Sequence, residues 1–143
     1  MRNFLLLILF VGWMPFVASG QMSKELHTTA MECWELKDYA CAEIYLRDLI
    51  KLETDSEFLV DYCLKLGTIL GESGDSKEAF KLYKMALKLN PQSTETYVKR
   101  GELYSSEGNS KKALADFEKA LSIDPDYAPA LSHKAELLVE NLH

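Results

Sequence analysis

The sequence contains little of what several common classes of function require. Its 143 residues include three cysteines and three histidines, and no two cysteines stand in a C-x-x-C pair. Lysine and arginine number 16 against 22 aspartates and glutamates. The chain therefore lacks the basic surplus that is typical of proteins that bind nucleic acids or anionic membranes. A glycine-rich phosphate-binding loop is also absent, so nothing favours a nucleotide site.

No group of residues indicates catalysis or a metal centre. His27, His133 and His143 lie far apart in the sequence. Neither His27 with Met31 nor His133 with Glu136 offers the three or four ligands that a metal site needs. We therefore expect a protein that is not an enzyme and that binds no cofactor and no metal.

No apolar run is long enough to span a membrane. The longest, residues 4–18, contains Pro15, whereas a spanning helix needs about 20 apolar residues. One basic residue before this run and small residues after it predict a secretory signal peptide, residues 1–20, cleaved after Gly20. An uncleaved membrane anchor is the alternative. A signal peptide predicts an exported protein: periplasmic or secreted in a bacterium, or in the secretory pathway of a eukaryote.

The three cysteines allow two interpretations. Cys33 and Cys41 could form a disulfide in an exported protein, which would leave Cys63 over. Alternatively, all three are small apolar side chains buried in helix packing, as free cysteines commonly are. The sequence favours the second interpretation.

What the sequence does contain is an internal repeat of 34 residues. Residues 65–91 read KLGTILGESGDSKEAFKLYKMALKLNP, and residues 99–125 read KRGELYSSEGNSKKALADFEKALSIDP. Aligned without a gap, the two stretches share glycines, alanines and the final proline. Two unrelated amphipathic helices would share the apolar period but not these residues. The chain therefore contains two copies of one structural unit.

The pattern after residue 22 is helix, short turn, helix, with no strand-like alternation. Glycine-containing turns separate the helices, and Pro91 and Pro125 each end a helical run. Asp75 and Glu78 have the spacing of a helix cap. The predicted helices are 23–36, 39–52, 58–72, 76–89, 94–107, 110–123 and 127–141.

Small and large residues alternate on one face of the second helix of each pair. The spacing i, i+4, i+7, i+8 places them together, and they are Ala79, Tyr83, Ala86 and Leu87, repeated as Ala113, Phe117, Ala120 and Leu121. In the first helix, Gly67 and Gly101 each cost about 1 kcal/mol of helix stability relative to alanine. Close packing against the aromatic ring is the expected reason for both glycines.

These helix pairs resemble tetratricopeptide (TPR) repeats. The resemblance is clearest in residues 94–127, where Tyr97, Gly101, Tyr104, Gly108, Ala113, Phe117, Ala120 and Pro125 match the family pattern. It implies an all-α, right-handed superhelical solenoid of about three helix-turn-helix repeats. The expected divisions are a degenerate repeat at 21–56, with an insertion in ETDSE, then repeats at 57–93 and 94–127, and a C-terminal capping helix at 128–143.

The resemblance also implies a function, because TPR proteins bind extended peptides or partner helices on the face formed by the first helix of each pair. On this chain, that face predicts a partner-binding groove formed by Met31, Trp34, Asp61, Leu64, Lys65, Thr68, Glu95, Val98, Lys99, Glu102 and Ser105. Glu72, Ser132, Glu136 and Glu140 extend the same face. Trp34 either anchors the partner or packs within the fold.

Acidic residues outnumber basic ones on this face, which favours a basic or amphipathic protein partner. Some TPR proteins grip a carboxylate-ended chaperone tail with basic residues. Here Lys65 and Lys99 fit that role, but Glu95 would repel a carboxylate. Two other functions stay open: self-association as an assembly scaffold, and metal or redox binding through Cys33, Cys41 and His27.

Overall fold

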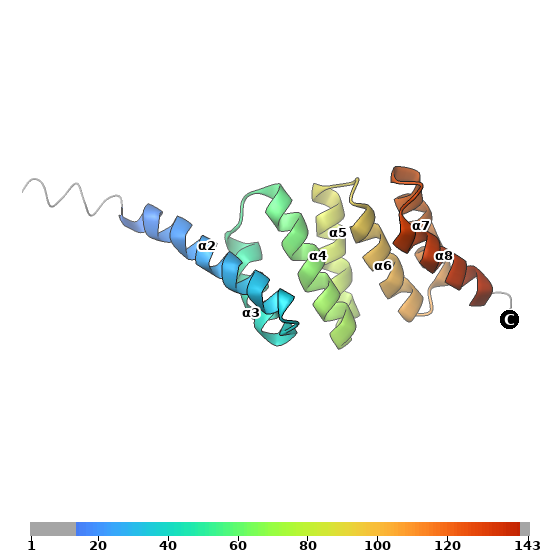
Figure 1. The fold of residues 1–143 in the computed structure, drawn as a ribbon, viewed down its shortest axis with the longest axis horizontal. Helices are drawn as coiled ribbons and strands as arrows, with labels where there is room; N and C mark the ends of the chain where they lie inside the picture. The colour runs from blue at the N-terminus through green and yellow to red at the C-terminus, as the bar shows by residue number, and fades with distance from the viewer. Residues whose placement is uncertain (1–13, 141–143) are drawn as a thin grey trace, which may run out of the picture. The chain divides into compact units, whose positions relative to one another are not determined.

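The computed structural model describes the backbone of residues 14–140 and the side chains of residues 21–140. Within this part every regular element is an α-helix (Figure 1). The helices are α2 (Met14–Glu35), α3 (Tyr39–Leu52), α4 (Ser56–Ser73), α5 (Ser76–Leu89), α6 (Thr94–Ser106), α7 (Ser110–Ile123) and α8 (Ala128–Glu140). The chain divides into two compact units, unit 1 up to Glu53 and unit 2 from Thr54.

Six of the seven helices begin and end within two residues of the predicted bounds, whereas α2 is already helical at Met14, the first described residue, rather than from residue 23. Residues 1–13 lie outside the described residues, so the signal peptide and its cleavage after Gly20 stay predictions. Among the residues that are described, no helix has both the length and the apolar character to cross a membrane.

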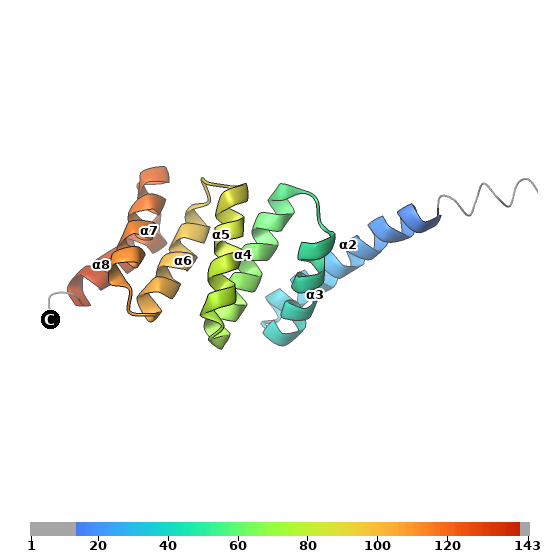
Figure 2. The ribbon, with the colours of Figure 1, turned by 180° about the vertical axis from the view of Figure 1, so that it is seen from behind.

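Unit 2 arranges its five helices in two rows, which Figures 1 and 2 show from opposite sides. Each helix packs on the next along the chain, and α6 also contacts both α4 and α8. We call α4, α6 and α8 the first-helix row, and α5 and α7 the second-helix row. Every second helix thus fills the space behind two first helices.

Side chains at the helix ends account for the boundaries. Asp75 accepts a hydrogen bond from the backbone N–H of Glu78 at 3.2 Å, and Asn109 accepts one from Lys112 at 3.3 Å. These bonds satisfy N–H groups that a helix start leaves without a partner. At the other end of α4, Gly74 has a φ of 93°, a left-handed conformation that suits glycine.

The predicted insertion lengthens a helix rather than a loop. Only residues 53–55 separate α3 from α4. By the 34-residue register, the start of α6 at Thr94 corresponds to Val60, so α4 begins four residues early, at Ser56. Asp55 caps this added turn by accepting from the N–H of Glu57 at 2.9 Å.

The two helical glycines let an aromatic ring lie directly against the first helix, as predicted. A methyl group on Gly67 would stand 2.7 Å from Cε1 of Tyr83, and one on Gly101 would stand 2.5 Å from Cε1 of Phe117. Both rings are almost completely buried. Real side chains do not approach so closely, so each glycine is required by the packing of its own helix pair.

An ion pair joins α6 to α7 inside the second repeat of the register. Arg100 donates from Nε and Nη2 to the two carboxylate oxygens of Asp116, at 2.7 and 2.6 Å. The pKa of Arg100 is raised, and its hydrogen bonding to Asp116 is the largest cause. The corresponding residues one register earlier are Leu66 and Leu82, so α4 and α5 carry apolar side chains at these two positions. The sequence analysis did not foresee this exchange.

Cys63 is fully buried in α4 as a free thiol, and burial raises its pKa from 9.0 to about 11. Between pH 9 and 11 the unfolded thiol therefore loses its proton while the folded thiol keeps it. Stability should fall across this window, by up to about 3 kcal/mol. Urea unfolding at pH 8, 9, 10 and 11 checks this. The Cys63→Ala variant should lose less stability between pH 9 and 10, whereas equal slopes for the two proteins would contradict the assignment.

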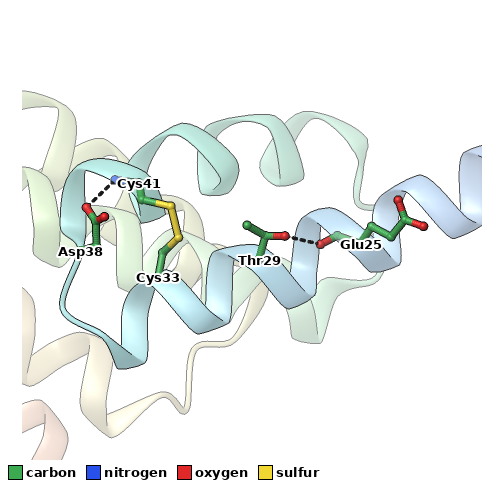
Figure 3. The surroundings of a disulfide bond; sticks show 5 residues. All are labelled: Glu25, Thr29, Cys33, Asp38 and Cys41. Atoms are coloured by element: carbon green, nitrogen blue, oxygen red, sulfur yellow. Dashed lines mark hydrogen bonds between the residues drawn. A yellow bond between two sulfur atoms is a disulfide. The ribbon is translucent and has the colours of Figure 1, made fainter.

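Unit 1 is a helix pair closed by a disulfide, which corrects the favoured interpretation of Cys33 and Cys41 (Figure 3). The turn after α2 reverses the chain, with Lys37 at a φ of 57°. Asp38 then caps α3 by accepting from the N–H of Cys41 at 3.1 Å. This tight reversal leaves the two cysteine Cα atoms 5.8 Å apart, within the range that a disulfide spans. Sequence spacing alone could not supply that distance.

Candidate functional site: the first-helix row of unit 2

The 34-residue register sets the polar residues of the first-helix row in columns. One column is Lys65, Lys99 and His133, a second is Thr68, Glu102 and Glu136, and a third is Glu72, Ser106 and Glu140. Because α4, α6 and α8 lie in one row, each column has one residue on each of these three helices. Two clefts are lined by residues of these columns, one between α4 and α6 and one between α6 and α8.

The α4–α6 cleft has a volume of about 230 Å³. Its lining comes from three helices: Thr68, Gly71 and Glu72 of α4, Tyr83 of α5, and Lys99, Glu102, Leu103 and Ser106 of α6. The Tyr83 hydroxyl donates to Oγ1 of Thr68 at 3.4 Å. Gly71 leaves room beside Leu103, whose Cδ1 would lie 3.5 Å from a methyl group there.

The α6–α8 cleft has a volume of about 400 Å³. It is lined by Glu102, Ser105 and Ser106 of α6, Phe117 of α7, and His133, Glu136, Leu137 and Glu140 of α8. Phe117 and Leu137 are buried core residues and form its floor. The His133 ring stacks on Phe117 with 5.6 Å between ring centroids. Glu102 and Ser106 line both clefts, so the two clefts adjoin.

Glu102 connects the charged groups of the row. Its Oε2 accepts from Nζ of Lys99 at 2.9 Å, and its Oε1 lies 2.9 Å from Nε2 of His133. Nδ1 of the same imidazole lies 3.3 Å from Oε2 of Glu136. The contact between Glu102 and His133 joins α6 to α8, whereas the other two pairs each lie within one helix. Together they form a chain of polar contacts along the two helices.

The negative charge of the row also affects Tyr83. The pKa of this phenol is raised to about 12; burial is the largest cause, and the carboxylates of Glu102 and Glu72 contribute in the same direction. The hydrogen bond to Thr68 acts in the opposite direction. The α4–α6 cleft therefore combines an apolar wall with negative potential.

The structure gathers four of the predicted groove residues around these clefts: Thr68, Lys99, Glu102 and Ser105. Leu64 and Val98 are buried, at 8% and 2% exposure, and contribute to the core rather than to an open surface. The remaining three of unit 2 lie on the same helices but line neither cleft: Asp61, Lys65 and Glu95. Asp61 and Lys65 form an ion pair with each other.

Met31 and Trp34 lie on α2, in unit 1. Met31 lines a shallow surface hollow with His27, Thr28, Glu32 and Glu35 of α2 and with Leu36, the residue after this helix. The Trp34 ring is half-buried and packs against Tyr39 at 5.7 Å between centroids. Trp34 therefore makes a packing contact within unit 1, and its role in binding a partner stays a prediction.

Seven lining residues were not assigned to the groove from sequence: Gly71, Tyr83, Leu103, Ser106, Phe117, His133 and Leu137. Tyr83 and Phe117 were expected only as packing residues. His133 was considered only as a metal ligand, yet it stands 34 residues after Lys99. Extending the register by one more step would have placed it on the groove face.

The chain's repeats match a known family. Residues 60–93 and residues 94–127 each match the tetratricopeptide repeat family. Among curated proteins, no sequence matches this chain.

Several solved structures share the fold. The TPR domain of Arabidopsis OM64 has a TM-score of 0.75 at 20% identity, over 85% of this chain and 98% of that one. The first TPR of Spaghetti (RPAP3), bound to the HSP90 peptide SRMEEVD, has a TM-score of 0.75 at 15% identity, over 86% and 95%. YrrB, a TPR protein with an unusual peptide-binding site, has 0.72 at 23% identity, over 79% of this chain and 57% of that one.

At these identities the likeness establishes the fold, and it confirms the predicted class. The family match does not extend to residues 21–56, so the degenerate first repeat stays a prediction. The chain contains two tetratricopeptide repeats, at residues 60–93 and 94–127, in an all-α fold of the tetratricopeptide-repeat type.

Proposed function

We propose that this protein is a non-enzymatic interaction module, and that the first-helix row of unit 2 holds a segment of a partner protein. The observation that carries the proposal is the pair of adjoining clefts that share Glu102 and Ser106. Together they offer apolar floor and polar rim along three helices, which is the composition of a protein-binding surface. The peptide held by the TPR domain of Spaghetti (RPAP3) supports a peptide or helix as the occupant.

We further propose that the protein is exported. The disulfide between Cys33 and Cys41 supports this, because disulfides persist in oxidising compartments and are rare in the cytosol. The apolar residues near the N-terminus support it independently, since they have the layout of a signal peptide. The partner is accordingly expected in the same compartment.

Site-specific photo-crosslinking in the native compartment tests the binding face. The full chain carries benzoylphenylalanine in place of Ser106, which lines both clefts, or in place of Lys119, which is exposed on α7. An adduct should form from position 106 only, and the added substitution Glu102→Lys should abolish it. The same adduct from both positions, or one unaffected by Glu102→Lys, would place binding elsewhere.

A second candidate function is self-association, and α8 provides the observation that favours it. Leu131 and Leu138 are 48% and 46% exposed on this helix. By register they correspond to Cys63 and Leu70 of α4, which are buried. Sedimentation of the full chain beside Leu138→Glu distinguishes the two functions. A dimer that the substitution dissociates would support assembly, whereas a monomer at all concentrations would leave α8 as a capping helix.

A further inference from the structure

The α6–α8 cleft surrounds an apolar floor with negative charge. Phe117 is 1% exposed and Leu137 is 3% exposed at its base. Three carboxylates line it, those of Glu102, Glu136 and Glu140, together with the imidazole of His133. Even with a protonated imidazole, carboxylates outnumber cations in the lining.

These carboxylates differ in how far their charge is already satisfied. Glu102 is held between Lys99 and His133. Glu136 contacts His133 through Oε2 and accepts from Oγ of Ser132 at 3.4 Å through Oε1, but its side chain is 65% exposed. Glu140 is exposed and makes no hydrogen bond or ion pair within the described part of the chain. The open acceptors thus lie on the α8 side of the cleft.

The size and lining of the cleft indicate which kind of cation it could bind, a metal ion or a basic side chain. Among the described residues, no three His, Cys, Asp or Glu side chains lie close enough together to hold a metal ion. A cleft of about 400 Å³ instead has room for a long side chain, whose methylene groups would cover Phe117 and Leu137. A guanidinium presents five N–H donors in a plane and stacks on aromatic rings, and the acceptors here are spread around the stacked rings of His133 and Phe117.

The neighbouring cleft also carries two carboxylates, Glu72 and Glu102, but it is less suited to a cation. Lys99 lines the α4–α6 cleft, so a second cation there would meet its ammonium group. The same Lys99 does not line the α6–α8 cleft. Charge complementarity therefore directs a basic side chain to the α8 end of the row.

We propose that the α6–α8 cleft binds an arginine side chain of the partner, with the guanidinium against Glu136 and Glu140 and the methylene stem over Phe117 and Leu137. This inference rests on the proposed function and specifies the partner's chemistry. It also separates this protein from a TPR domain that holds SRMEEVD, a peptide with three acidic residues and one basic residue.

Nuclear magnetic resonance titration of the full chain tests the assignment with defined probes. Two nine-residue peptides of alanine and serine carry either arginine or the isosteric, uncharged citrulline at their centre. The arginine peptide should shift the ring resonances of His133 and Phe117 and bind about fivefold more tightly than the citrulline peptide. The double variant Glu136→Gln/Glu140→Gln should remove that difference.

A matched control removes two carboxylates outside the clefts, by Glu57→Gln and Asp126→Asn, and should retain the preference for arginine. Equal binding of the arginine and citrulline peptides would overturn the inference, as would equal effects of the cleft and control variants. If a partner still crosslinks at position 106 in that case, the proposed function stands and only the arginine assignment fails. Absence of that crosslink would instead reject the binding face itself.

Discussion

Replacing Asp116 with alanine is expected to lower the free energy of unfolding of unit 2 by about 2–4 kcal/mol. The substitution removes both hydrogen bonds from Arg100 and leaves its guanidinium without a carboxylate partner. The side chains of Arg100 and Asp116 are 21% and 9% exposed, so water replaces little of what is lost. Urea unfolding of the full chain, followed by helical circular dichroism, measures the change.

The chain itself supplies the control for this prediction. Leu66 and Leu82 occupy the corresponding positions in the preceding repeat. The double variant Arg100→Leu/Asp116→Leu should therefore recover most of the lost stability, because apolar pairs often replace buried ion pairs without cost. A loss below about 0.5 kcal/mol for Asp116→Ala would show an ion pair of surface strength instead.

Gly101→Ala is expected to destabilise unit 2 by up to about 2 kcal/mol, although alanine is the better helix former. The added methyl group would stand 2.5 Å from the Phe117 ring, and overpacking of this kind costs about 1–3 kcal/mol. That cost exceeds the gain of about 1 kcal/mol in helix propensity at the upper end of the range. The same ring also rests beneath His133, so it has little freedom to move away.

Gly71→Ala is the matched control on α4. A methyl group there would meet Leu103 at 3.5 Å, an ordinary contact, so this substitution should be neutral or stabilising by up to about 1 kcal/mol. Urea unfolding of both variants gives the comparison. If both alanines stabilise the protein, close packing is not the reason for Gly101.

The sequence predicted most of the fold because the fold is repetitive. The same helix-pair pattern occurs twice in the chain, so its glycine, alanine and aromatic positions could be distinguished from chance matches. The start of α2 was wrong because the helical pattern was followed only from Ser23, after the predicted signal peptide, whereas the chain is already helical at Met14. The prediction that Cys33 and Cys41 are free thiols was wrong. The 5.8 Å between their Cα atoms depends on the turn between the helices, which the spacing of the two residues in the sequence does not determine.

The resemblance to TPR repeats placed Thr68, Lys99 and Glu102 on the groove face, and all three line the clefts. Their role in binding a partner stays a prediction. The resemblance could not distinguish exposed from buried positions on one helical face, which is why the buried Val98 was included. It also could not predict which side chains touch between helices. The contact between Glu102 and His133 depends on how α6 packs on α8, and only the register hints at it.

Carboxyl footprinting of the full chain, with and without the crosslink-identified partner, tests the central claim most directly. Carbodiimide labelling reports how far each carboxylate is covered. The account predicts reduced labelling of Glu72, Glu136 and Glu140 on the first-helix row when the partner is bound. Labelling of Glu118, exposed on α7, should not change. Protection of Glu118 with unchanged labelling of the first three would contradict the account.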